Sequence, residues 1–233
     1  PLAVEWEQRG MMFAPDDDGM RNDPAPITVR HLLTMTAGFE STPRWSRRDG
    51  DLARFLVARR RVTKAGERFE YDNLAYNLLA LALEAAVKQP VPDFAREQFF
   101  GPLGIERFKW ETGPNGHALG FAGLSMRTVD MARIGQLMLQ QGRWQDRPVV
   151  PPAFVAAAVR AQTAGGPPVG MGYGYGWWIV PGPPQPIYLA SGFGGQMVWV
   201  NTAAELVVAT TARGTADSNA RGQAVALLRN ELV

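Results

Sequence analysis

A length of 233 residues with 46% hydrophobic and 20% charged residues is ordinary for a globular chain and too apolar for a disordered one. The formal charge of +2 at pH 7 comes without a basic stripe interleaved with aromatic residues, and no apolar run approaches about 18 residues, so neither a nucleic-acid partner nor a membrane span is predicted. The absence of cysteine excludes disulfide scaffolds, thiolate zinc sites and cysteine nucleophiles, and it leaves the compartment open between periplasmic or secreted and cytoplasmic.

The first 26 residues show no periodicity and are rich in turn formers, so residues 1–26 are predicted to be an irregular segment. Because the sequence starts at Pro1 without a methionine, we expect that a preceding segment has been removed. Thr28 is predicted to be the N-cap of a short helix that runs to Met35 and ends before Gly38. Residues 51–61 also have apolar side chains at helical spacing.

Four-residue apolar spacing predicts the clearest helix over residues 73–88. Pro92 is expected to open the next helix, Thr128 to cap another, and Pro151 or Pro152 to start a last one that runs to Val159. Residues 27–165 are therefore predicted to be a mainly helical domain.

The pattern changes after the Gly-Gly-Pro-Pro run at residues 165–168. Four strands are predicted at residues 173–180, 187–190, 196–200 and 205–211, followed by a closing helix over residues 217–232. Residues 166–233 would thus form antiparallel strands with a C-terminal helix, and the fold class is α+β. A sheet of three or four strands leaves a bare edge, so we expect the fold to be incomplete at its N-terminus.

Several hydrolytic mechanisms are excluded by what the sequence lacks. The chain has two histidines, His31 and His117, and no Gly-x-Ser-x-Gly nucleophile elbow, to which Ser125 comes closest. It also has no His-Glu-x-x-His zinc motif and no phosphate-binding glycine loop. His31 is predicted to be structural, and His117 has no carboxylate near it in the sequence, so neither a Ser-His-Asp enzyme nor a metal enzyme is favoured.

Six segments, in this order, are similar to motifs of one enzyme family. They are ITVRHLLTMTAGF at 27–39, AGERFEYDNLAYNLL at 65–79, PLGI at 102–105, GLSMRTVDMARIG at 123–135, YGWW at 175–178 and SGFGGQ at 191–196. The ordered set resembles the class C β-lactamase-related serine hydrolases of the penicillin-binding-protein superfamily, including their esterase and amide-hydrolase members. The resemblance implies a β-lactamase-like fold and a serine hydrolase that works through an acyl-enzyme without a cofactor.

That family acylates the serine of a Ser-x-x-Lys motif, in which the two side chains lie one helical turn apart. None of the five serines here is followed by lysine at that distance. In the family the motif precedes the segment that resembles residues 27–39. The resemblance therefore implies that the nucleophile lies ahead of Pro1, and that this chain alone is inactive.

The family's second motif is present as Tyr71-Asp72-Asn73. The resemblance implies that Tyr71 is the general base, which needs a neighbouring ammonium because the ordinary pKa of a tyrosine is about 10. Asn73 would hold the substrate carbonyl and orient the lysine. A structural alternative makes Tyr71 a buried hydroxyl and Asn73 the N-cap of the helix over residues 73–88.

The third motif is matched by Ala190-Ser191-Gly192, where relatives have Lys-Thr-Gly or His-Thr-Gly. The resemblance implies that the backbone N–H of Phe193 is half of the oxyanion hole and that Ser191 and Gly192 bind substrate. Alanine at position 190 removes the cationic or hydrogen-bond-donating group that would hold a substrate carboxylate, which favours a less anionic ester or amide. The alternative for this segment is a bulged strand turn.

Trp45 and Trp178 are predicted as walls of the substrate pocket, and the partner is a small-molecule ester or amide. Two other functions remain open. The first alternative is a catalytically inactive binding or regulatory module. The second is a peptidoglycan D-amino-acid peptidase or a β-lactamase on the same fold. The sequence does not indicate an oligomeric state.

Overall fold

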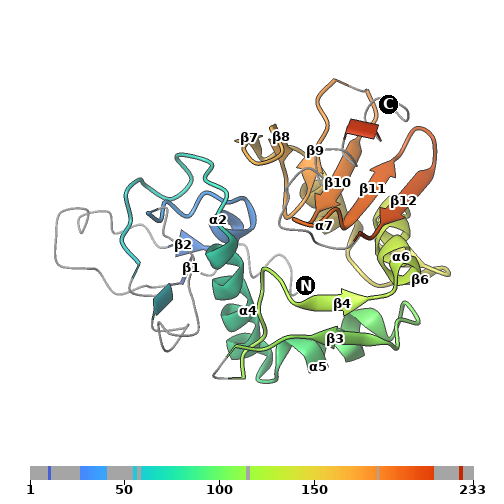
Figure 1. Ribbon diagram of the computed structural model, residues 1–233, viewed down its shortest axis with the longest axis horizontal. Helices are drawn as coiled ribbons and strands as arrows, with labels where there is room; N and C mark the ends of the chain where they lie inside the picture. Colours follow the sequence, from blue (N-terminus) through green and yellow to red (C-terminus); the bar gives the residue numbers. More distant parts are fainter. Residues whose placement is uncertain are drawn as a thin grey trace. The chain divides into compact units, whose positions relative to one another are not determined.

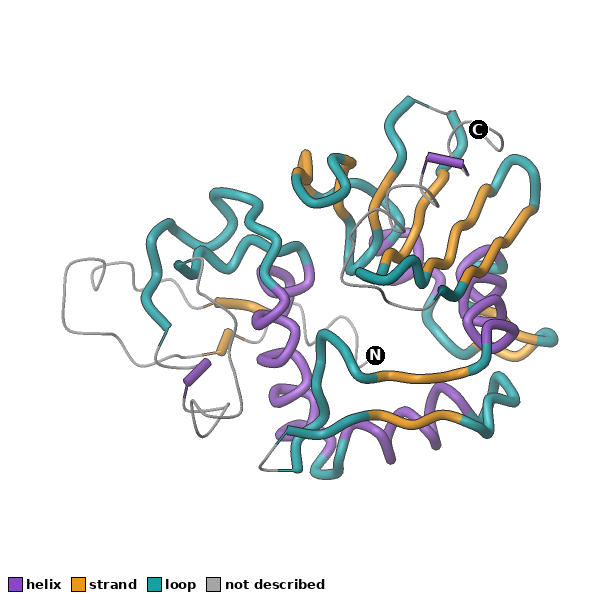
Figure 2. Tube along the Cα trace, viewed as in Figure 1, coloured by secondary structure: helices purple, strands orange, loops and turns teal. Residues whose placement is uncertain are grey.

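The computed structural model describes residues 10–11, 27–40, 55–56, 59–113, 116–182, 184–212 and 226–227. The chain divides into two compact units that alternate along the sequence. The first unit consists of Pro1–Phe99 and Phe108–Ser125, and the second of Phe100–Arg107 and Met126–Val233. Each unit has its own helices and strands (Figures 1 and 2). Each also has its own buried side chains.

The first unit is built on two helices, α2 (Val29–Leu33) and α4 (Asn73–Val87), which pack against each other (Figure 1). Helix α2 begins at Thr28, as predicted, with a capping box in which Thr28 and His31 bond each other's backbone N–H groups. It ends at Leu33 rather than at Met35, because Met35 takes a left-handed conformation with φ of 58°. One apolar core joins the two helices, and its fully buried members are Ile27, Leu32, Leu56, Ala75 and Leu78.

Short strands also occur where the sequence predicts helix or irregular chain. β1 (Gly10–Met11) pairs antiparallel with β2 (Ile27–Thr28), so the segment 1–26 is not wholly irregular. β3 (Phe108–Trp110) pairs with β4 (Leu124–Met126), and β5 (Arg143–Trp144) pairs antiparallel with β6 (Arg147–Pro148). The segment 27–165, predicted to be mainly helical, therefore also contains short strands. Strands of two or three residues are too short for an alternating pattern to reveal them.

The remaining helices are close to the predicted ones. α5 (Val91–Ala95) has Pro92 in its first turn and continues as the π-helix η2 (Arg96–Phe100), and α7 (Pro152–Ala158) starts at a proline. α6 (Thr128–Leu139) has Arg127 at its N-cap, so the prediction that Thr128 caps it is wrong. The Thr128 hydroxyl instead hydrogen-bonds the Thr211 hydroxyl at 2.9 Å.

The second unit contains a six-stranded antiparallel sheet in the order β12-β11-β10-β9-β8-β7. The predicted strand over 173–180 is two strands, because Gly174 and Gly176 form the turn between them. Gly165 and Gly166, after which the sequence pattern changes, belong to a further strand, β7. The strands are β7 (Thr163–Gly166), β8 (Met171–Tyr173), β9 (Trp178–Ile179), β10 (Ile187–Ser191), β11 (Met197–Asn201) and β12 (Leu206–Thr210).

The centre of this sheet is buried on both faces. All five residues of β11 are buried, and Trp199 and Val200 have no exposed surface. On β10, Tyr188 is buried and meets the ring of Trp177 edge-on at 5.3 Å between centroids. Of the predicted closing helix only residues 226–227 are described, and they are helical; the rest lies outside the described residues. No helix in the described part of the chain combines the length and apolarity needed to cross a membrane.

Helix α6 lies against β11 and β12 (Figure 1), and Gly135 allows the close approach. A Cβ atom at position 135 would lie 2.6 Å from a methyl group of Val207 and 2.7 Å from one of Val198. We expect Gly135→Ala to lower the free energy of unfolding, because overpacking costs about 1–3 kcal/mol and alanine returns only about 1 kcal/mol of helix propensity. Urea unfolding measures the change. Gln136→Ala on the same helix is the control, and a Gly135→Ala variant as stable as this control would contradict the packing argument.

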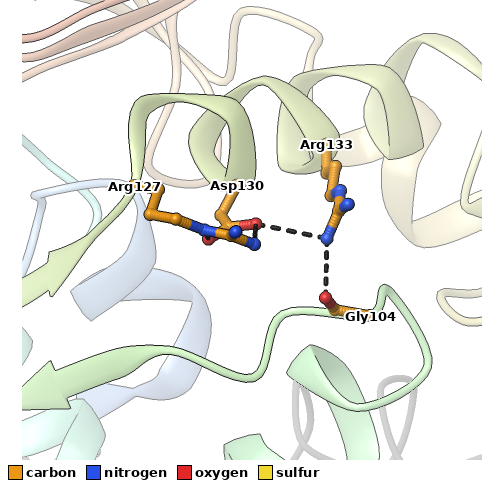
Figure 3. Close-up of polar contacts among 4 residues, drawn as sticks. All are labelled: Gly104, Arg127, Asp130 and Arg133. Atoms are coloured by element: carbon orange, nitrogen blue, oxygen red, sulfur yellow. Dashed lines mark hydrogen bonds and ion pairs between the residues drawn. The ribbon is translucent and has the colours of Figure 1, made fainter.

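A buried carboxylate ties the segment Phe100–Arg107 to α6 within the second unit (Figure 3). Asp130 has no exposed side-chain surface and accepts hydrogen bonds from Arg127 at 2.7 and 2.9 Å. Arg133 donates to Asp130 at 3.2 Å and to the carbonyl oxygen of Gly104 at 2.6 Å. The hydrogen bonds from Arg127 hold the pKa of Asp130 below its usual range, although burial acts in the opposite direction.

Candidate active site

The Tyr71-Asp72-Asn73 motif lies at the start of α4. The N-cap is Asp72, whose Oδ1 accepts from the backbone N–H of Leu74 at 2.9 Å, and Asn73 is the first residue of the helix. The alternative that makes Asn73 the N-cap is therefore wrong, because the carboxylate of Asp72 takes that place. Asn73 is exposed and Tyr71 is half-buried, so the two residues that the family resemblance marks as catalytic flank a capping residue.

The chain before α4 is bonded to the segment that follows α2. The backbone N–H of Glu70 donates to the carbonyl oxygen of Met35 at 2.8 Å, and the backbone N–H of Asp72 points at the sulfur of Met35 at 3.3 Å. Four residues before Glu70, the backbone N–H of Gly66 donates to the carbonyl oxygen of Thr36 at 2.8 Å. Two of the family-like segments, 27–39 and 65–79, thus lie side by side in the first unit and fix the backbone on which Tyr71 stands.

The second group of predicted residues forms the turn from β10 to β11. β10 ends at Ser191, and the turn closes with a hydrogen bond of 2.7 Å from the N–H of Gly192 to the carbonyl oxygen of Gln196. A Cβ atom on Gly192 would lie 3.2 Å from the side-chain oxygen of Gln196, so the turn favours glycine there. Phe193 stands at the tip of the turn with 52% of its surface exposed.

Gln196 holds this turn, and the sequence analysis did not assign it a role. Its side-chain oxygen accepts from the N–H of Gly194 at 3.1 Å, and its amide nitrogen donates to the carbonyl oxygen of Ala212 at 2.9 Å. The Thr210 hydroxyl adds a hydrogen bond of 2.9 Å to the carbonyl oxygen of Gly195. The backbone around Phe193 is therefore held by hydrogen bonds within the turn and from Thr210 and Ala212, at and just after the end of β12.

Of the two predicted tryptophans, Trp178 is a buried residue of β9. Trp45 lies outside the described residues. Trp178 is only 2% exposed, pairs with Leu189 across β9 and β10, and meets the Tyr173 ring edge-on at 4.7 Å. These contacts are those of a core side chain, and contact between Trp178 and a substrate stays a prediction.

The histidines and acidic residues have contacts of their own. Nδ1 of His31 accepts from the backbone N–H of Thr28 at 3.2 Å, which fits the predicted structural role, and burial lowers the pKa of His31. His117 does have a carboxylate partner, contrary to its sequence surroundings: Glu84 on α4 lies 2.5 Å from its Nδ1. Among the described residues no group of three His, Asp or Glu side chains is placed to hold a metal ion.

Tyr71 and Asn73 therefore meet at one helix start, while Ser191, Gly192 and Phe193 meet at one strand turn in the other unit. A family model described as beta-lactamase matches residues 15–230. The chain belongs to the beta-lactamase family. The predicted β-lactamase-like α+β fold is confirmed, and with it the membership of a family of hydrolases with that fold.

Individual relatives agree with this membership of the beta-lactamase family. The protein flp of Staphylococcus aureus strain MRSA252 is 29% identical over 105 residues, which are 41% of this chain and 21% of that protein. A structure assigned as a 6-aminohexanoate-dimer hydrolase from Bacillus anthracis superposes with a TM-score of 0.75 and 22% identity, over 91% of this chain and 62% of that one. EstCE1, a hydrolase with promiscuous acyltransferase activity, gives a TM-score of 0.67 and 18% identity, over 90% and 70%.

The match with flp thus spans about a fifth of that protein, and the match with the Bacillus anthracis structure spans less than two thirds of it. At identities near 20% the likeness to the solved structures concerns the fold.

Proposed function

We propose that this chain provides the general base and one oxyanion donor of a serine hydrolase that cleaves a small-molecule ester or amide through an acyl-enzyme, without a cofactor. The observation that carries the proposal is the fixed turn at the start of α4, where Tyr71 and Asn73 flank the capping Asp72. The sequence has no Ser-x-x-Lys, so the proposal places that pair outside these 233 residues.

In this mechanism the phenolate form of Tyr71, stabilised by the lysine, accepts the proton of the serine hydroxyl. The serine oxygen attacks the carbonyl carbon, and the resulting oxyanion accepts hydrogen bonds from two backbone N–H groups, that of the serine itself and a second one, which the family resemblance assigns to Phe193. Tyr71 then returns the proton to the leaving alcohol or amine, and water hydrolyses the acyl-enzyme.

Residue 190 supports a neutral substrate over an anionic one. Ala190 is half-buried at the end of β10 and offers no charge or donor on its side chain. A substrate carboxylate near that position would lose its hydration without gaining a counter-charge from this residue. The proposal therefore favours an esterase or amide hydrolase over a D-amino-acid peptidase or a β-lactamase.

A second function is favoured by the missing Ser-x-x-Lys, namely a catalytically inactive binding or regulatory module. A fluorophosphonate probe followed by intact mass separates the two. We expect one adduct per molecule on the longer polypeptide that carries the Ser-x-x-Lys, and no adduct on the five serines of this chain alone. Hydrolysis of a neutral nitrophenyl ester should accompany the adduct. A longer polypeptide without adduct and without turnover would favour the binding module, and an adduct on Ser125 or Ser191 would contradict the proposed nucleophile.

A further inference from the structure

Arg59 is a buried arginine in the same unit as Tyr71. Its side chain is 2% exposed, so its charge needs partners inside the protein. Nη1 donates to Oδ2 of Asp72 at 2.5 Å, and Nη2 donates to the carbonyl oxygen of Glu40 at 2.8 Å. The guanidinium also lies over the ring of Phe39, 4.6 Å from its centroid.

Asp72 connects Arg59 to the start of α4, where Tyr71 and Asn73 lie. One carboxylate oxygen binds Arg59, and the other caps α4 through the N–H of Leu74. The backbone N–H of Asp72 is held in addition by the sulfur of Met35. Since Tyr71 and Asn73 are the covalent neighbours of Asp72, the direction of both depends on how this residue is held.

The contact also balances charge. The Asp72 side chain is 16% exposed, and without Arg59 its negative charge would lie largely buried beside Tyr71. The family-like motif assigns roles to Tyr71 and Asn73. It does not include Arg59, which lies 13 residues before Asp72.

We propose that Arg59 is a positioning residue for the turn Tyr71–Asn73, acting through its ion pair with Asp72. The expected effect of Arg59 on catalysis rests on the proposed function. Its expected effect on the backbone at Asp72 rests on the contacts alone. Arg59 contacts Asp72, Glu40 and Phe39 and is not assigned any contact with substrate.

The test uses the longer polypeptide that carries the Ser-x-x-Lys and compares Arg59→Met with Arg60→Met. Arg60 is the matched control, because it is the neighbouring arginine, its side chain is exposed, and its guanidinium forms an ion pair of 3.4 Å with the Glu40 carboxylate. Asp72→Ser, alone and with Arg59→Met, removes the partner charge and retains a good N-cap residue. The readouts are kcat and KM for a nitrophenyl ester, with active sites titrated by the fluorophosphonate.

Arg59→Met is expected to lower kcat by about 10-fold to 100-fold with KM little changed, because a misdirected base slows chemistry more than binding. Arg60→Met should stay within about twofold of wild type. In the Asp72→Ser background, Arg59→Met should cost less than about threefold, because the residue through which it acts is gone. An equal loss in both backgrounds, or a loss confined to KM, would overturn the proposal.

Hydrogen exchange separates this proposal from the proposed function. Arg59→Met should speed exchange in a peptide covering the N–H of Leu74 by at least about tenfold, and Arg60→Met should not. This readout needs no turnover. If the wild type is inactive, the proposed function fails, and exchange at the start of α4 still decides the positioning role: unchanged exchange in Arg59→Met would refute it.

Discussion

Tyr71→Phe is expected to lower kcat for a nitrophenyl ester by about 10²- to 10⁴-fold, which is the usual effect of removing a general base. The substitution deletes one hydroxyl oxygen from a half-buried side chain and leaves the Asp72 cap of α4 in place. KM should change little, because the hydroxyl is proposed to move a proton and not to bind the ester. The measurement is steady-state hydrolysis at neutral pH, per titrated active site, on a polypeptide that includes the proposed Ser-x-x-Lys pair.

Tyr76→Phe provides a matched control on the same helix. The Tyr76 hydroxyl donates to the carbonyl oxygen of Leu33 at 3.2 Å, and the proposed mechanism does not use it. Its loss should lower the free energy of unfolding by about 1 kcal/mol and leave kcat within about twofold of wild type. A Tyr71→Phe enzyme that keeps more than about a third of the wild-type kcat would remove Tyr71 from the mechanism.

Local signals in the sequence located the elements that carry the candidate motifs. The helix predicted over residues 73–88 is observed as Asn73–Val87, because its apolar residues recur at helical spacing and bury one face. Thr28 caps α2, and a proline starts α7, since both signals act through the backbone of the next few residues. The strands β10, β11 and β12 also lie where apolar runs predict them.

Contacts between distant residues could not be predicted in this way. Arg59 and Asp72 are 13 residues apart, and His117 and Glu84 are 33 apart, so no local pattern indicates either pair. Gln196 reaches Ala212 only because β11 and β12 pair in the sheet. The contacts that fix the backbone at Asp72 and around Phe193 are therefore of the kind that only the folded chain reveals.

Asp130→Asn is expected to lower the free energy of unfolding at pH 7 by about 1.5–3 kcal/mol, because a buried carboxylate loses charge-assisted hydrogen bonds while the two arginines stay partly exposed to water. The carboxylate has no exposed surface and accepts from Arg127 and Arg133, and the asparagine amide can replace only part of this set (Figure 3). Two arginines would be left beside a neutral group, and the bond from Arg133 to Gly104 would lose its support. Urea unfolding of the two proteins measures the difference.

The pH dependence identifies the carboxylate as the cause. Because folding lowers the pKa of Asp130, its stabilisation is fully present above the ordinary aspartate pKa of about 3.9 and is lost as pH falls through the lower folded-state pKa. The difference between wild type and Asp130→Asn should therefore be constant from pH 7 to about pH 5 and shrink below about pH 4. Asp93→Asn is the matched control, since Asp93 also lies in the first turn of a helix but is exposed, and its loss should cost less than about 1 kcal/mol. A difference for Asp130→Asn that persists unchanged in acid would show that the amide disturbs packing and that the ion pair is not the source of the stability.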